Sequence, residues 1–274
     1  MFQPRLGVSL ITISREFSPE AIGALAQSGV QTLEVMPASL MNGGQGPTDA
    51  AIDILRASRL EVASVHVPFG PGYDFSLADA GQARKGMEQS IMAGVDLTAR
   101  LGAGIMVVHA SGEPVEQADR QLRLGRAVES LAAIGERAAR CGIRVAIELL
   151  PRTCLGNTAD EMLWMLDALG DSGTFGACMD TNHSMDRHAD VPGDIRRLGS
   201  HLIATHVNDY DGVDEKHWLP GQGVLDWKAI LTALDQIGYT GPFNFECTLT
   251  GATVAQRIHD VEASFERLLN LRQR

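Results

Sequence analysis

The chain has 274 residues and a formal net charge of −11, and its 45% hydrophobic and 21% charged residues are the balance of an ordinary globular protein. The acidic charge argues against a nucleic-acid partner, because binding to a phosphate backbone requires a basic surface. The start lacks a signal-peptide pattern, no apolar run approaches roughly 18 residues, and the four cysteines lack CxxC spacing. These features predict a cytoplasmic protein with reduced thiols and no membrane partner.

Short β-rich runs alternate with helix-like segments along the chain. Strands are predicted over eight segments: Leu6–Ile13, Thr32–Met36, Glu61–Val67, Gly104–Ala110, Ile143–Leu149, Thr174–Asp180, Leu202–Asn208 and Pro242–Cys247. Helices are predicted between them, among others over Pro19–Ser28, Pro47–Ser58, Ala80–Leu101, Ala118–Arg140, Asn157–Leu169 and Trp227–Ile237. Ser18 is a candidate N-cap of the first of these helices. Glycines in the position of a C-terminal cap are Gly29, Gly102, Gly142 and Gly238.

This alternation implies right-handed strand–helix–strand crossovers and a parallel sheet. Eight units without a linker favour an α/β fold of the closed (β/α)₈ type, a TIM barrel, as a single domain over residues 1–274. An open, doubly wound sheet is the alternative. The sequence has no GxGxxG after the first strand and no GxxxxGK[ST], so the usual nucleotide-binding fingerprints are missing.

Residues of metal-ligand type stand at the ends of six predicted strands, where a barrel carries its active site. They are His66, His109, Glu148, Asp180, His206 and Glu246. Because side chains alternate along a strand, Glu148, Asp180 and Glu246 share a face with small residues and are predicted to point into the barrel. His206 is predicted to point the same way, in register with Leu202 and Ala204.

Three carboxylates in one dry cavity would repel each other strongly unless a cation neutralised them. With one imidazole they form a ligand set of three oxygens and one nitrogen, which suits Mn²⁺, Mg²⁺, Co²⁺ or Zn²⁺. The sequence therefore predicts one divalent cation, held by Glu148, Asp180, His206 and Glu246. Glu34 ends the second strand and is expected to be a structural acid.

Several segments together resemble one known superfamily. They are VASVHVPFG (62–70), VAIELLPR (145–152), GACMDTNHSM (176–185), ATHVNDYDGVDEKHWLPGQGVLDW (204–227) and GPFNFECT (241–248). They resemble the xylose isomerase-like barrels, which include sugar and sugar-phosphate isomerases and epimerases. The resemblance implies a small-molecule carbohydrate substrate, a divalent metal with Mn²⁺ as first choice, and a homodimer or homotetramer.

The same superfamily contains metal-dependent apurinic-site endonucleases with further metal-binding histidines. Their extra ligands match five residues of this chain: His66, His109, His183, Glu215 and His217. A second metal ion therefore stays open. The long basic DNA-binding loops of those endonucleases are not apparent, and the net charge of −11 repels a phosphodiester backbone.

The ketohexose 3-epimerases of the superfamily have an Arg six positions after the metal-binding histidine and a Glu six positions after the strand-five glutamate. This chain has Gly212 and Cys154 there, whereas its Arg152 matches. Residues predicted to bind the substrate are His66, His109, Arg152, His183, Glu215 and His217. Phe69 and Trp218 could line the mouth of the site.

The predicted function is isomerisation or epimerisation of a small sugar, sugar phosphate or related polyhydroxy carbonyl compound. The reaction would proceed by proton transfer through a metal-stabilised enediolate. Glu148 and Glu246 are the predicted catalytic base and acid. Alternatives are a dehydratase or lyase acting on a related keto-sugar, a multi-metal phosphodiester hydrolase of endonuclease type, and a non-catalytic sugar-binding barrel.

Overall fold

In the computed structural model, which describes residues 3–40, 49–70, 72–77 and 81–271, eight parallel strands close into a barrel in the order β1 to β8. The strands are β1 (Leu6–Ser9), β2 (Thr32–Val35), β3 (Glu61–His66), β4 (Ile105–Val108), β5 (Arg144–Glu148), β6 (Phe175–Asp180), β7 (Leu202–Val207) and β8 (Phe243–Phe245). Because β1 pairs with both β2 and β8, the sheet has no free edge. The predicted (β/α)₈ barrel is confirmed, and the open sheet is excluded.

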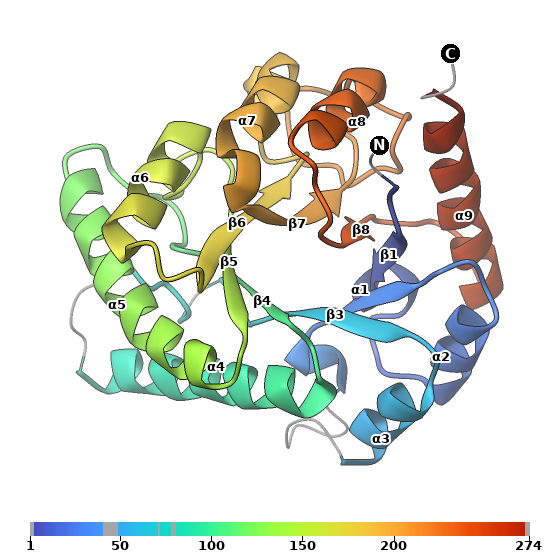
Figure 1. The fold of residues 1–274 in the computed structure, drawn as a ribbon, viewed down its shortest axis with the longest axis horizontal. Coiled ribbons are helices and arrows are strands. Elements are labelled where there is room, and N and C mark those ends of the chain that lie inside the picture. Colours follow the sequence, from blue (N-terminus) through green and yellow to red (C-terminus); the bar gives the residue numbers. More distant parts are fainter. Residues whose placement is uncertain (1–2, 41–48, 71, 78–80, 272–274) are drawn as a thin grey trace.

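Helices surround this barrel on its outer side (Figure 1). The α-helices are α1 (Leu10–Ile13), α2 (Pro19–Ala26), α3 (Asp49–Ala57), α4 (Gly81–Leu101), α5 (Arg120–Arg140), α6 (Ala159–Leu169), α7 (Val191–Leu198), α8 (Trp227–Gln236) and α9 (Val254–Leu271). Short 3₁₀ helices are η1 (Pro37–Leu40), η2 (Met185–Asp190) and η3 (Gly199–His201). No helix in the described part of the chain is both long and apolar enough to cross a membrane.

Four of the five predicted cap residues lie at helix ends as expected. The predicted helix starts at Pro47 and Ala80 lie outside the described residues. The Ser18 side chain accepts a hydrogen bond from the Ala21 N–H and caps α2, as expected. Gly102, Gly142 and Gly238 have positive φ angles, the backbone conformation in which glycine ends a helix. The cap predicted for Gly29 is wrong, because α2 already ends at Ala26; the Gly29 N–H instead donates to the Glu262 carboxylate at 2.6 Å.

The first predicted strand is too long. β1 stops at Ser9, and Leu10–Ile13 turn into the short helix α1, where Leu10 and Ile13 are buried. The run Leu6–Ile13 is mostly apolar and shows neither the period of an amphipathic helix nor that of a half-buried strand, so its pattern does not separate the two. Packing of α1 against β2 and α9 decides the conformation here.

The barrel wall separates two hydrophobic cores. The larger lies between strands and helices, whereas a small inner cluster fills the barrel itself; its buried members are Val107, Ala146, Cys178, Ile203 and Ala204. The predicted inward position of Leu202 is wrong. The pairing of β6 with β7 shifts by one residue, from Ala177↔Leu202 to Cys178↔Ala204, and Leu202 therefore belongs to the outer core. Ala204 and His206 keep the predicted inward register.

Candidate metal centre and active site

Four residues from adjacent strand ends converge at the C-terminal mouth of the barrel. Glu148 and Asp180 end β5 and β6, His206 lies in β7, and Glu246 directly follows β8. Asp180 pairs in register with His206, while Glu148 pairs with Cys178. The structure therefore brings together all four residues that the sequence predicts as metal ligands.

The distances between these side chains suit a single cation. Nδ1 of His206 lies 2.9 Å from Glu246 Oε2, 3.3 Å from Glu148 Oε1 and 3.8 Å from Asp180 Oδ2. One atom from each of the four residues can be chosen so that all lie within 4.8 Å of one another. Two atoms bound to one cation at about 2.0–2.4 Å are separated by at most about 4.8 Å. The three carboxylates and one imidazole therefore fit a divalent ion in spacing and in chemistry.

Asp180 is held in place by its neighbours. The Asn182 N–H donates to Oδ1 at 2.7 Å, and Nδ2 of Asn208 donates to Oδ2 at 3.2 Å. Burial raises the pKa of Asp180, since the fully enclosed carboxylate loses its hydration. These two donors orient the Asp180 carboxylate towards His206. Its Oδ2 oxygen keeps a lone pair with which it could bind a cation.

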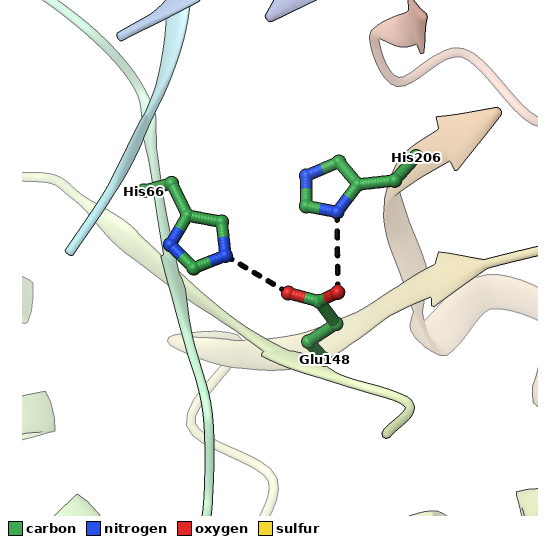
Figure 2. A group of neighbouring side chains, drawn as sticks. All are labelled: His66, Glu148 and His206. Carbon is green, nitrogen blue, oxygen red and sulfur yellow. Dashed lines mark hydrogen bonds and ion pairs between the residues drawn. The ribbon is translucent and has the colours of Figure 1, made fainter. Parts of the chain in front are cut away.

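Two further histidines hold the other oxygen of Glu148. His66 Nε2 lies 3.0 Å and His109 Nε2 lies 3.1 Å from Glu148 Oε2. In Figure 2 the Glu148 carboxylate stands between His66 and His206, with one oxygen facing each ring. Nδ1 of His66 donates to the Val67 carbonyl at 2.8 Å, and in the protonated ring Nε2 donates to Glu148.

The charged groups of this cluster shift one another's pKa values. Burial opposes ionisation of Glu148, but the rings of His206 and His109 outweigh burial and hold its pKa well below the ordinary value. Burial likewise opposes ionisation of Glu246, whose pKa is lowered to about 2 by His206. For His66 the burial effect is outweighed by Glu148, which raises its pKa to about 9, whereas burial dominates at His109 and lowers its pKa.

A second group of possible ligands lies beside the first. His183, Glu215 and His217 also offer atoms within 4.8 Å of one another. Nδ1 of His183 hydrogen-bonds to the Leu149 carbonyl at 2.9 Å and lies 3.4 Å from Glu148 Oε1. His217 has a φ of 50°, an uncommon backbone conformation that turns the loop after β7 back over the site. The sequence leaves open whether a second metal ion binds. These three residues form a group that could hold one.

Arg152 bridges three loops above the barrel. Its Nε lies 2.9 Å from Glu113 Oε2, and its Nη2 lies 2.6 Å from Glu113 Oε1. Its Nη1 lies 2.5 Å from Glu215 Oε1 and 3.5 Å from Asp214 Oδ1. Hydrogen bonding to Glu113 is the main reason that the pKa of Arg152 is raised. The guanidinium charge is therefore already balanced by carboxylates of the protein.

A cavity of about 510 Å³ opens above this centre. All six residues predicted to bind substrate line it: His66, His109, Arg152, His183, Glu215 and His217. Of the four predicted metal ligands, Glu148 and Glu246 line the cavity, whereas Asp180 and His206 lie outside its lining. Phe69 also lines it and stacks on His109 with ring centroids 4.5 Å apart, but Trp218 does not.

Sequence reasoning missed two acidic residues of the cavity. Asp74 lines the cavity and pairs with Arg123 at 2.7 Å, and Glu113 holds Arg152. Both lie in loops, where no strand period points to them; the position of Glu113 five residues after β4 is the only signal. Glu34, expected to be a structural acid, contacts His206 inside the barrel.

Known proteins with related sequences and structures support this picture of the fold. A solved D-tagatose 3-epimerase-like protein is 21% identical with a TM-score of 0.81, covering 98% of both chains. A solved L-ribulose 3-epimerase is 20% identical with a TM-score of 0.81, covering 99% of this chain and 96% of that one. At such identities the likeness shows the fold.

Curated relatives also match by sequence, among them a dehydratase and an epimerase. The 3-dehydroshikimate dehydratase of Pseudomonas putida is 23% identical over 278 residues, which are 97% of this chain and 41% of the dehydratase. The L-ribulose 3-epimerase of Mesorhizobium japonicum is 29% identical over 179 residues, 63% of this chain and 57% of the epimerase. The chain thus spans about half the length of these curated relatives.

The family model described as "Xylose isomerase-like TIM barrel" matches residues 22–270, which is nearly the whole chain. This match agrees with the closed parallel barrel and with the polar cluster at its C-terminal mouth. The chain belongs to the xylose isomerase-like TIM barrel family.

Proposed function

We propose that the protein is a metal-dependent isomerase or epimerase of a small, uncharged polyhydroxy carbonyl compound such as a ketose. One observation carries the proposal. Glu148 and Glu246 belong to the four-residue ligand cluster and also line the cavity, whereas Asp180 and His206 belong to the cluster alone. Two carboxylates can therefore reach both a bound ion and a substrate, as a proton transfer between two faces of a carbon requires.

Glu148, Asp180, His206 and Glu246 would hold the ion, for which Mn²⁺ is the first choice. When bound, a divalent cation supplies Lewis-acid polarisation of a carbonyl and a neighbouring hydroxyl oxygen. Glu148 and Glu246 approach the substrate from different strands, β5 and β8. One carboxylate would take the proton from the carbon beside the carbonyl, and the other would return a proton to the opposite face.

The histidines around Glu148 support this role. His66 and His109 both contact Glu148 Oε2 and help to keep this carboxylate ionised, which is the form that can take up a proton from a substrate. Phe69 and Leu77 form an apolar part of the cavity wall, while His183 and His217 offer polar atoms to hydroxyl groups. A mixture of apolar surface and fixed hydrogen-bonding groups is what a small polyol needs.

The charge of the cavity favours an uncharged substrate. Five of the described lining residues are acidic: Asp74, Glu113, Glu148, Glu215 and Glu246. Arg152 is the one Lys or Arg among the described lining residues, and Glu113 and Glu215 already neutralise it. A phosphate or carboxylate group would therefore find no unpaired guanidinium or ammonium group to bind it among the described lining residues.

The names of the relatives agree with this class of reaction. Similar proteins include 3-epimerases of ribulose and psicose and a D-tagatose 3-epimerase-like protein, and all three sugars are ketoses. A dehydratase is the second candidate, because the 3-dehydroshikimate dehydratase matches 97% of this chain. Both reactions begin with loss of a proton beside a carbonyl, so they differ in the product and not in the first step.

Proton exchange with solvent tests the proposal. The Mn²⁺-loaded protein is incubated with a panel of free ketoses in deuterated water, and the products are analysed by NMR and mass spectrometry. We expect an isomeric or epimeric sugar with deuterium at the carbon next to the carbonyl. A product lacking one water would support the dehydratase. An active preparation that yields deuterium-free isomer would reject proton transfer by the two glutamates.

A further inference from the structure

Glu34 lies in β2 and is fully buried inside the barrel. Its carboxylate faces His206 from below the cavity: Nε2 of His206 lies 3.0 Å from Oε1 and 3.2 Å from Oε2. Glu34 and His206 are 172 residues apart, and Glu34 is not one of the residues that line the cavity. It therefore reaches a substrate only through another residue.

Two neutral polar side chains contact the Glu34 carboxylate. Oγ of Ser64 donates to Glu34 Oε2 at 2.7 Å, and Nδ2 of Asn244 lies 3.5 Å from the same oxygen. Among the described residues no Lys or Arg forms an ion pair with Glu34, so His206 is its one ionic partner there. A buried carboxylate with a single ionic partner is costly unless that partner carries or transmits positive charge.

The two nitrogens of His206 have different neighbours. Nδ1 faces Glu148, Asp180 and Glu246, the three carboxylates of the candidate metal centre. Nε2 is the nitrogen that points away from Glu148 in Figure 2, and it faces Glu34. A histidine binds a metal ion through an unprotonated nitrogen, so ligation through Nδ1 requires the proton on Nε2.

We propose that Glu34 is a positioning residue for the metal centre. Its carboxylate accepts the Nε2–H hydrogen bond of His206, holds the ring in the tautomer with Nδ1 free, and makes Nδ1 a stronger ligand. Carboxylates that accept from the far nitrogen of a metal-binding histidine act in this way in other metal sites. Ser64 and Asn244 keep the Glu34 carboxylate in position. The inference rests on the proposed metal centre and adds to it a residue that touches neither ion nor substrate.

The test is the affinity for Mn²⁺, measured by titration calorimetry on metal-free protein. Glu34→Gln keeps the size and an accepting oxygen but removes the charge. We expect it to weaken Mn²⁺ binding by about 10- to 100-fold, the usual effect of such a partner. The melting temperature of the metal-free form should change little. Thr32→Val is the matched control, because Thr32 is buried in the same strand and no contact with His206 is found for it in the described structure.

The outcomes separate the two proposals. Wild-type protein that binds no Mn²⁺ would overturn the metal centre and the role of Glu34 with it. Wild-type binding with an unchanged affinity in Glu34→Gln would overturn the role of Glu34 alone. Equal losses in Glu34→Gln and Thr32→Val would show a general disturbance of the barrel interior and would also overturn it.

A second measurement avoids any dependence on the folding of the variant. ¹⁵N NMR of the histidines in wild-type protein loaded with diamagnetic Zn²⁺ identifies the protonated nitrogen of His206. We expect the proton on Nε2, with the shifted proton resonance of a hydrogen bond to a carboxylate. A proton on Nδ1 would overturn the proposal.

Discussion

Arg152 and Glu113 form a two-pronged ion pair at the mouth of the barrel, with Nε 2.9 Å from Oε2 and Nη2 2.6 Å from Oε1. The pair joins the loop after β5 to the loop after β4, and Glu215 extends it to the loop after β7. An arginine occupied in this way does not offer its paired donor face to an anionic substrate. Glu113 therefore determines whether the Arg152 guanidinium is available to bind an anionic group of a substrate.

Removing the charge of Glu113 should relax the selection against anionic substrates. In Glu113→Gln the guanidinium of Arg152 loses one ionic partner and becomes available to a phosphate group. We expect the ratio of kcat/KM for a free ketose over its phosphate ester to fall by about tenfold, the scale of one charge-assisted hydrogen bond. Steady-state kinetics on the two substrates measure it. Glu116→Gln, an exposed acid in the same loop, should keep the wild-type ratio. A wild-type ratio in Glu113→Gln as well would refute this role.

The carboxylate of Glu246 should be essential for turnover and less so for metal binding. Glu246→Gln keeps an oxygen near His206 but cannot take up a proton at neutral pH. We expect metal to remain bound while kcat falls by at least about 10²-fold, the usual scale of a general base. Metal content and kcat are measured on the same preparation, with the exposed Glu266→Gln as a control. A variant that keeps its metal and nearly full activity would remove Glu246 from the chemistry.

Metal removal should make stability depend on pH. Without an ion, burial disfavours the charged forms of His66 and His217, but the nearby carboxylates of Glu148 and Glu215 outweigh it and raise both pKa values to about 9. The corresponding stabilisation is fully present below the unfolded value of 6.5 and is lost as pH rises through about 9. The melting temperature in chelator should therefore fall over this pH range. With Mn²⁺ it should fall less steeply, because the cation compensates the charge of the buried carboxylates in place of the protonated histidines.

Thermal unfolding followed by circular dichroism in chelator and in Mn²⁺ checks this dependence. His66→Gln should make the melting temperature in chelator depend less steeply on pH, because one of the two histidines with a raised pKa is gone. His201→Gln, an exposed residue outside the cavity, should leave the slope unchanged. A melting temperature in chelator that stays constant from pH 6.5 to about 9 would contradict the charge arrangement derived for His66.

A side chain at Gly135 in α5 should lower the stability of the protein, because this helix packs closely against β6 there. A Cβ at this position would lie 2.2 Å from Cζ of Phe175 in β6, so Gly135→Ala forces helix and strand apart or turns the ring. Gly125→Ala in the same helix meets nothing within 4 Å and should gain helix propensity. We expect Gly135→Ala to be less stable than Gly125→Ala by about 1–3 kcal/mol. Urea unfolding compares the two, and equal stabilities would show that α5 adapts freely.

The strand period placed much of this site from sequence. Glu148 and Asp180 stand in register with small inward residues, Ala146 and Cys178, and the structure finds both of these in the inner cluster. Once eight strands and a closed barrel are inferred, acids and histidines at their C-terminal ends must meet at one mouth. Alternation of side chains is a local property of a strand, so it can be read from neighbouring residues alone.

Tertiary structure decided what depends on pairing between distant segments. The shift at Ile203 moved Leu202 outward, because register is set by the neighbouring strand and not by the strand's own pattern. Glu34 meets His206 across the barrel axis, and Glu113 meets Arg152 between two loops. Loops have no side-chain period, and contacts across a barrel require the closed sheet to bring them together. The sequence by itself therefore determined the barrel and its ring of ligands, while the folded chain determined which partner each charged group has.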